Sequence, residues 1–141
     1  MDETVPAVEA ANTTFYTALS LADFGLMERL WLPSPDVVCI HPGWPPLHGW
    51  EDVSESWRNI FKNQGPLHVW PSEVHLRLYG QTAEVSCLEN IDMNQVRRAG
   101  VLQTRATNIF RLTGDEWKML EHHALPMPGG GARPLEPFST N

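Results

Sequence analysis

The fold is decided by the stretch TAEVSCLENIDMNQVRRAGVLQTRATNIFRLTGDEWKMLEHHAL, residues 82–125. Apolar and polar residues alternate in it with the period of a half-buried β-strand, in three runs: 82–92, 101–112 and 116–125. Four polar residues occupy apolar positions of these runs: Glu89, Asn108, Glu121 and His123. A polar group on a core face costs stability unless it finds a partner or lines a cavity. The pattern therefore predicts neighbouring strands whose polar side chains share one pocket.

Residues before this stretch predict three helices. Apolar residues at helical spacing indicate a first helix from Pro6 to Ala22, and Asp23 suits the N-cap of a short second helix that ends before Pro33. A third helix is predicted from Trp50, with Gly65 as its C-cap.

Two further strands are predicted, at 36–41 and 68–79, with hairpin turns at 80–81 and 113–115. Residues 42–49 contain three prolines and two glycines, so we expect an irregular, stiff loop there. Helices early and an antiparallel meander late favour the α+β class. A curved sheet wrapped around the helices would leave a cone-shaped cavity.

Bulk composition limits the classes of function. The 141 residues predict one domain over 1–126, followed by a flexible Gly/Pro-rich tail over 127–141. The formal net charge of −7 argues against nucleic acid or an anionic membrane as a partner. Cys39 and Cys87 lie in apolar runs and are expected to be buried and reduced. With no signal-like N-terminus and no membrane-length apolar run, we expect a cytoplasmic protein.

Several short segments carry a family resemblance: Phe15-Tyr16, Val38-Cys39-Ile40-His41-Pro42-Gly43-Trp44, Ala106-Thr107-Asn108-Ile109-Phe110 and His122-His123-Ala124. With them the chain resembles the nuclear transport factor 2-like superfamily, in its SnoaL-like branch. The resemblance implies a cystatin-like α+β cone, commonly a homodimer that packs through the outer surface of the sheet. The superfamily includes isomerases, dehydratases, polyketide cyclases and non-catalytic modules, so the fold alone does not fix the function.

The chain is also similar to ketosteroid isomerases of this superfamily. That similarity places Tyr16 at the tyrosine of the first helix, His41 at the base before a proline, and Asn108 at the second acid. His41 and Asn108 both depart from the aspartates of those enzymes, so steroid isomerisation itself is not implied. The resulting hypothesis has His41 as general base, with Tyr16 and Asn108 donating hydrogen bonds to a developing enolate oxygen.

The expected ligand is a small apolar carbonyl compound with an acidic α-proton, such as a polyketide or steroid-like ring. Trp44, Trp57, Glu89 and His123 are predicted to contact it. Each candidate also has a purely structural interpretation: His41 fixing the proline loop, or Tyr16 and Asn108 bonded within the core. A bulge in the last strand would instead turn its polar residue towards solvent.

Metal binding is not expected. His41, His48, His122 and His123 are available, but adjacent histidines in a strand point to opposite faces. The chain has neither an HExxH motif nor paired cysteines. The sequence therefore predicts no metal and no cofactor. The alternative to an isomerase- or cyclase-type enzyme is a non-catalytic ligand-binding or dimerisation module.

Overall fold

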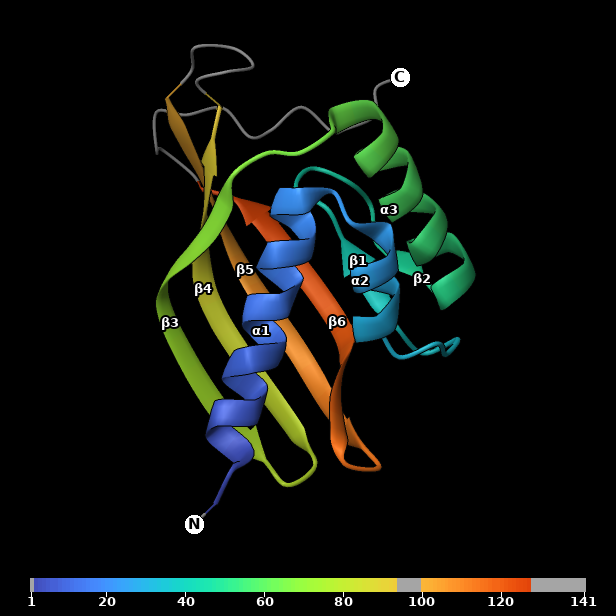
Figure 1. Ribbon diagram of the computed structural model, residues 1–141, viewed down its shortest axis with the longest axis vertical. Helices are drawn as coiled ribbons and strands as arrows, with labels where there is room; N and C mark the ends of the chain where they lie inside the picture. Colours follow the sequence, from blue (N-terminus) through green and yellow to red (C-terminus); the bar gives the residue numbers. More distant parts are fainter. Residues whose placement is uncertain (1, 94–99, 128–141) are drawn as a thin grey trace.

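Three helices and six strands make up the computed structural model, which describes residues 2–93 and 100–127. In chain order they are α1 (Thr4–Leu21), α2 (Phe24–Leu30), β1 (Val38–Ile40), β2 (Leu47–His48), α3 (Trp50–Gln64), β3 (Val69–Tyr79), β4 (Thr82–Asp92), β5 (Val101–Thr113) and β6 (Glu116–Pro126). Figure 1 shows α1 lying across one face of the curved sheet, with α2 and α3 beside it at the β1 end.

The sheet has the strand order β2-β1-β6-β5-β4-β3. Strands β3 to β6 form the antiparallel meander that the alternating pattern predicts, and β1 joins its far side by running parallel to β6. This arrangement confirms the α+β cone expected from the resemblance. It also places His41, which follows β1 directly, next to the C-terminal half of β6.

Local sequence signals fix most of the element ends. Asp23 caps α2 by accepting a hydrogen bond from the backbone nitrogen of Leu26 at 3.0 Å. The β3–β4 and β5–β6 hairpins turn on two residues each, beginning with Gly80 and Gly114 at φ angles of 62° and 66°. Glycine adopts such angles without steric cost, so both turns form where the sequence predicts them.

A one-residue bulge in β6 changes which of its side chains face the helices. Ile109 pairs with Glu121 while Phe110 pairs with Met119, so Leu120 has no partner residue on β5. An extra residue reverses the alternation of every residue beyond it. Strand β3, at the edge of the sheet, carries a second irregularity between Ser72 and His75.

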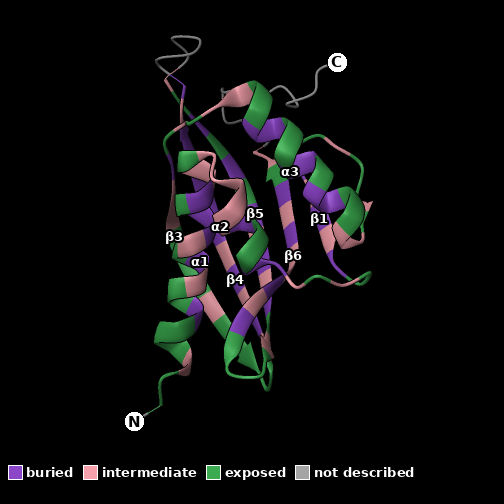
Figure 2. Ribbon diagram, turned by 45° about the vertical axis from the view of Figure 1, so that its right-hand side comes forward, coloured by how far each residue is buried: buried purple, intermediate pink, exposed green. Residues whose placement is uncertain are grey.

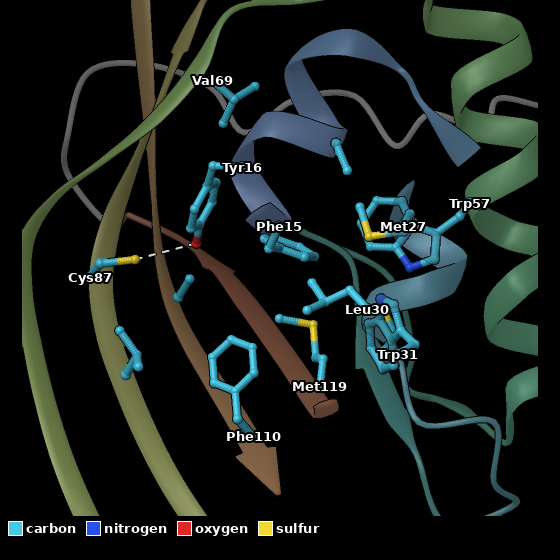
Figure 3. Packing of buried hydrophobic residues seen from close by; sticks show 14 of the residues in the cluster. Phe15, Tyr16, Met27, Leu30, Trp31, Trp57, Val69, Cys87, Phe110 and Met119 are labelled. Carbon is cyan, nitrogen blue, oxygen red and sulfur yellow. Dashed lines mark hydrogen bonds between the residues drawn. The ribbon is translucent and has the colours of Figure 1, made fainter. Parts of the chain in front are cut away.

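The core lies between the sheet and the helices. Figure 2 shows buried residues alternating along the strands and along the helix faces that meet them. Phe15 of α1 is fully buried and its ring contacts those of Tyr16 and Trp57, with centroids 4.9 and 5.7 Å apart. These contacts, visible in Figure 3, tie α1 to α3 across the core.

Two sequence predictions need correction or fall outside the described residues. The loop expected over 42–49 contains the short strand β2, which pairs antiparallel with β1, because two of its residues lie beyond the prolines. Apart from Met127, the predicted tail lies outside the described residues. Over the described ranges, none of the helices combines the length and apolarity needed to span a bilayer.

The position of Phe15 generates a stability prediction. Phe15→Ala should lower the free energy of unfolding by about 3–5 kcal/mol, because it leaves a cavity between α1, α3 and the sheet. Urea unfolding followed by tryptophan fluorescence measures the change. Val5→Ala, at a residue 42% exposed on α1, is the matched control and should shift it by less than about 0.5 kcal/mol. Equal effects of both substitutions would contradict this account of the core.

Candidate functional site

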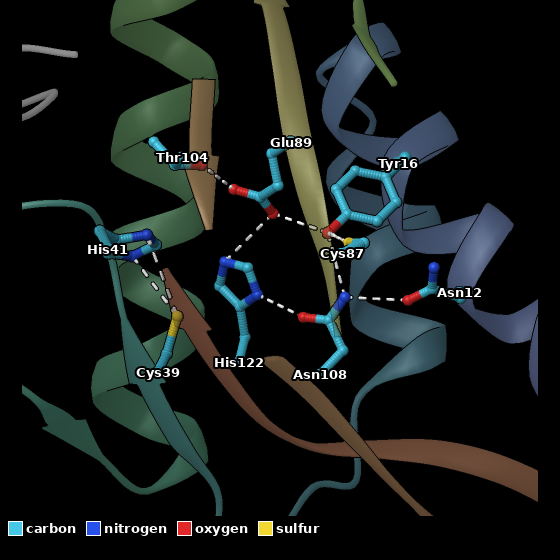
Figure 4. Close-up of polar contacts among 9 residues, drawn as sticks. All are labelled: Asn12, Tyr16, Cys39, His41, Cys87, Glu89, Thr104, Asn108 and His122. Atoms are coloured by element: carbon cyan, nitrogen blue, oxygen red, sulfur yellow. Dashed lines mark hydrogen bonds and ion pairs between the residues drawn. The ribbon is translucent and has the colours of Figure 1, made fainter. Parts of the chain in front are cut away.

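A buried network of polar side chains crosses the core from α1 to the sheet. Its members come from four elements and include residues far apart in the sequence: Asn12, Tyr16, Cys87, Glu89, Thr104, Asn108 and His122. Figure 4 shows the side chains of Tyr16, Glu89, His122 and Asn108 arranged as a ring. Polar groups buried from water need such partners, so the network satisfies groups that would otherwise destabilise the fold.

The carboxyl group of Glu89 accepts a hydrogen bond at each of its two oxygens. Tyr16 donates its hydroxyl proton to Oε2 at 2.7 Å, and Thr104 donates to Oε1 at 2.7 Å. Thr104 lies opposite Glu89 in the β4–β5 register, which explains that contact. Burial raises the pKa of Glu89 above its ordinary value, and the two hydrogen bonds oppose that rise.

His122 lies between Glu89 and Asn108. Its Nδ1 is 2.6 Å from Asn108 Oδ1, and its Nε2 is 3.9 Å from Glu89 Oε2. Burial is the main cause that holds its pKa well below the ordinary value, and His41 and His123 add to the effect. The ring is therefore neutral at neutral pH and has one nitrogen free to accept a proton.

His41 lies at the opposite wall. Its Nε2 is 2.9 Å from Ser56 Oγ, and because Ser56 donates its own proton to the Val53 carbonyl at 2.7 Å, His41 is the donor. The Cys39 sulfur lies 3.7 Å from Nε2 and 3.9 Å from Nδ1. Burial lowers the pKa of His41 to about 3, so it too is neutral at neutral pH.

A small cavity of about 50 Å³ lies between these groups. Its polar lining among the described residues includes His41, Glu89 and His122, and its walls are apolar, formed by residues such as Leu19, Trp57, Ile60, Phe61, Val69 and Ile91. The partly exposed Gln64, Gly65 and Leu67 mark its open side. One water molecule needs roughly 10–15 Å³ of such space, so the cavity has room for a few water-sized groups, the end of a ligand.

The residues expected from the sequence fall into two groups. His41, Trp57 and Glu89 line the cavity, whereas Tyr16 and Asn108 do not belong to its lining and are bonded to other side chains. The network brings Tyr16 and Asn108 together, at 3.0 Å, but His41 is separate from them. The sequence analysis also missed Asn12, which shares a helix face with Tyr16 and could have been found by its spacing of four.

Trp44 and His123 need separate comment. The Trp44 ring packs against His41, with centroids 4.7 Å apart, and is not part of the cavity lining. His123 faces away from the helices and contacts Glu121 at 2.7 Å. The expectation that His123 faces the pocket is wrong, because the bulge at Leu120 turns His122 inward instead. Plain alternation offers no signal that could have found His122.

The arrangement of these side chains also bears on metal binding. Within residues 2–93 and 100–127, no group of three or more His, Cys, Asp or Glu side chains is arranged to hold a metal ion. Cys39 and Cys87 are both free and buried, and burial is the main cause that raises the pKa of each thiol, to about 11 for Cys87.

The two buried histidines generate a pH prediction. A histidine whose pKa is depressed by folding contributes stability that is present above its unfolded pKa of about 6.5 and is lost as pH falls. Lowering the pH from 7.5 to 5.5 should therefore reduce the free energy of unfolding by about 1.4 kcal/mol for each of His41 and His122. Glu89 opposes this loss, since its raised pKa keeps a proton on the folded form.

The measurement compares wild type with His41→Asn, which keeps a donor near Ser56. Urea unfolding at the two pH values should show a loss smaller by about 1.4 kcal/mol in the variant. An unchanged difference between the two pH values would mean that His41 titrates alike in the folded and unfolded protein.

Comparisons with known proteins agree with this fold. A proposed dehydratase of the NTF2-like family from Streptomyces avermitilis is 38% identical, with a TM-score of 0.82 over 89% of this chain and 97% of that one. A proposed calcium/calmodulin-dependent protein kinase type II association domain from Thiobacillus denitrificans is 29% identical, with a TM-score of 0.77 over 84% of this chain and 94% of that one.

Among curated proteins, the F-box protein SKIP8 of Arabidopsis thaliana is 27% identical over 124 residues, 88% of this chain. The match spans 51% of that protein, so this chain corresponds to about half of its length. The profile of the SnoaL-like domain family matches residues 8–128, nearly all of the described structure. The chain therefore belongs to the SnoaL-like domain family of the NTF2-like superfamily, whose fold supports a small-molecule-binding domain.

Proposed function

We propose that the protein binds a small carbonyl compound in the cavity and catalyses proton transfer at its α-carbon. The observation that carries this is the composition of the cavity: apolar walls with three proton-active side chains, His41, Glu89 and His122. Neither lysine nor arginine is among the described residues that line it, so a carboxylate or phosphate ligand would find no cation there. A neutral, largely apolar ligand fits these walls.

His122 is the better placed base. Its Nε2 lies 3.9 Å from a carboxyl oxygen of Glu89, so a carbonyl group held by Glu89 would bring its α-carbon close to the ring nitrogen that takes the proton. His41 lines the same cavity as a second imidazole, but its hydrogen-bond partner is the hydroxyl of Ser56. His122 is therefore a better placed candidate for the general base than His41, the residue expected from the sequence.

Glu89 supports the other half of the reaction. Its raised pKa favours the protonated carboxyl, which can donate a hydrogen bond to the carbonyl oxygen as negative charge develops there. The α-proton moves to His122 Nε2, the electron pair of the C–H bond forms a carbon–carbon double bond, and the π pair of the carbonyl moves to its oxygen. Return of a proton to the same carbon completes an exchange, and in an unsaturated ketone its return to the far end of the conjugated system would complete an isomerisation. Tyr16 and Asn108 act through Glu89 and His122.

The cavity volume sets the size of the substrate. About 50 Å³ is well below the roughly 300–1,000 Å³ of pockets that enclose drug-sized ligands. A polyketide or steroid ring is therefore too large for this form of the cavity. A short aliphatic ketone fits better, with its chain directed towards Gln64 and Leu67.

Hydrogen–deuterium exchange tests this proposal. In D₂O, the protein should accelerate loss of the α-proton NMR signals of butanone, 2-pentanone or cyclohexanone. His122→Asn should reduce that acceleration by about 10²–10⁴-fold, the usual contribution of a general base. His123→Ala, which alters the neighbouring outward-facing side chain, is the matched control and should leave the rate unchanged.

His41→Ala and Glu89→Gln separate the roles of the remaining groups. If His41→Ala reduced the exchange rate as much as His122→Asn does, His41 would again be a candidate for the general base. No exchange on any ketone by the wild-type protein would remove the catalytic proposal and leave ligand binding alone.

A second candidate function is self-association through the outer face of the sheet. Val101 and Leu125 are 46% and 55% exposed, and Leu125 lies opposite Arg105 on that face. Exposed apolar residues on an otherwise polar sheet favour contact with a second copy. The similar chain from Thiobacillus denitrificans is described as an association domain, which supports this candidate.

Light scattering on a size-exclusion column tests the candidate. Wild type should have the mass of a dimer and Leu125→Glu that of a monomer, because the new carboxylate is tolerated beside Arg105 but not in an apolar contact. Leu21→Glu, at a residue 59% exposed at the end of α1, should remain a dimer. A monomeric wild type would exclude this interface.

A further inference from the structure

The hydrogen bonds around Asn108 restrict the state of the His122 ring. Asn108 Nδ2 contacts two acceptors, Asn12 Oδ1 at 2.9 Å and the Tyr16 hydroxyl oxygen at 3.0 Å. An amide nitrogen carries two hydrogens, so both are used. The remaining polar atom, Oδ1, lies 2.6 Å from His122 Nδ1.

The direction of each bond follows from this count. The Asn108 carbonyl oxygen can only accept, so His122 Nδ1 must be the donor. The Tyr16 hydroxyl accepts a hydrogen bond from Asn108 and donates one to Glu89 at 2.7 Å. Because its single hydrogen points to Glu89, the atom of Asn108 that faces Tyr16 must be the amide nitrogen. A neutral imidazole has a single N–H, so Nε2 carries the lone pair.

We infer that Asn108 is a positioning residue that holds neutral His122 in its Nδ1–H tautomer and so makes Nε2 the proton acceptor facing Glu89 and the cavity. As a role in catalysis this rests on the proposed function, but the tautomer itself does not. The opposite tautomer would set two lone pairs against each other across 2.6 Å and leave Nε2 unable to take a proton.

Other groups that face His122 are consistent with this state. Glu89 approaches from β4, His41 from the end of β1, and Tyr16 from α1 through Asn108, while His123 is the next residue of β6. The Phe15 ring covers one side of the imidazole, with centroids 4.6 Å apart. Of these groups, Asn108 is the one that contacts Nδ1 within hydrogen-bond distance.

The consequence for the ligand is specific. With its lone pair on Nε2, His122 offers the cavity an acceptor, not a donor. The ligand must therefore present an acidic C–H, an O–H or an N–H to His122. A carbonyl oxygen needs a donor elsewhere in the cavity, at the Glu89 carboxyl that the proposed function takes to be protonated.

The experiment is long-range ¹H–¹⁵N correlation NMR of the uniformly ¹⁵N-labelled protein at pH 7, with the His122 signals assigned by their loss in His122→Asn. We expect a pyrrole-type nitrogen at Nδ1 and a pyridine-type nitrogen at Nε2. The reverse pattern, or two protonated nitrogens, would overturn the inference.

Two substitutions test the part played by Asn108. Asn108→Asp keeps an acceptor at Nδ1 and adds a negative charge, so it should retain the N–H at Nδ1 and raise the midpoint of the His122 titration by more than one pH unit. Asn108→Leu removes the acceptor and should release the ring into a mixture of tautomers. Asn90→Ala, whose side chain bonds to Trp70, Ser72 and Gln103 and not to this network, should leave the tautomer unchanged.

These outcomes are independent of any activity. If Asn108→Leu does not fold, the wild-type spectrum and the Asn108→Asp titration still decide the question. A wild-type Nδ1–H signal together with no ketone exchange would remove the proposed reaction and keep the positioning role. An unchanged His122 midpoint in Asn108→Asp would show that Asn108 does not control the ring.

Discussion

Burial of the Glu89 carboxyl is the constraint on which the interior of this protein depends. A carboxyl without water must be surrounded by donors or lose its charge. The donors come from two other elements, Tyr16 on α1 and Thr104 on β5, with His122 of β6 on the remaining side. The placement of α1, the β4–β5 register and the course of β6 are thereby linked through one side chain.

The same constraint connects stability with chemistry. Groups that burial holds neutral, such as His41 and His122, destabilise the fold in acid and keep an unprotonated ring nitrogen at neutral pH. In such an environment the hydrogen bonds and charges are stronger than in water. Tyr16 and Asn108 are hydrogen-bonded to each other and lie outside the cavity lining, which Glu89 and His122 reach.

The similar solved structures are described as a proposed dehydratase and a proposed association domain, so the shared fold leaves the function to the individual site. Here the cavity and the outer face of the sheet are on opposite sides of β4, β5 and β6. Alternate residues of these strands serve each side: His122 faces inward while His123 faces outward. The proposed ligand binding and the proposed self-association would therefore use different residues of the same strands.

The sequence by itself determined the element order apart from β2, the Asp23 cap, the two-residue turns and the presence of Glu89 and Asn108 in the core, because each depends on local spacing or backbone preference. It also carried the family resemblance. Tertiary structure alone decided that His122 faces inward, since the bulge at Leu120 arises from pairing with β5. It likewise decided the cavity volume and the partners of Tyr16 and Asn108, which depend on how residues distant in sequence meet in the packed core.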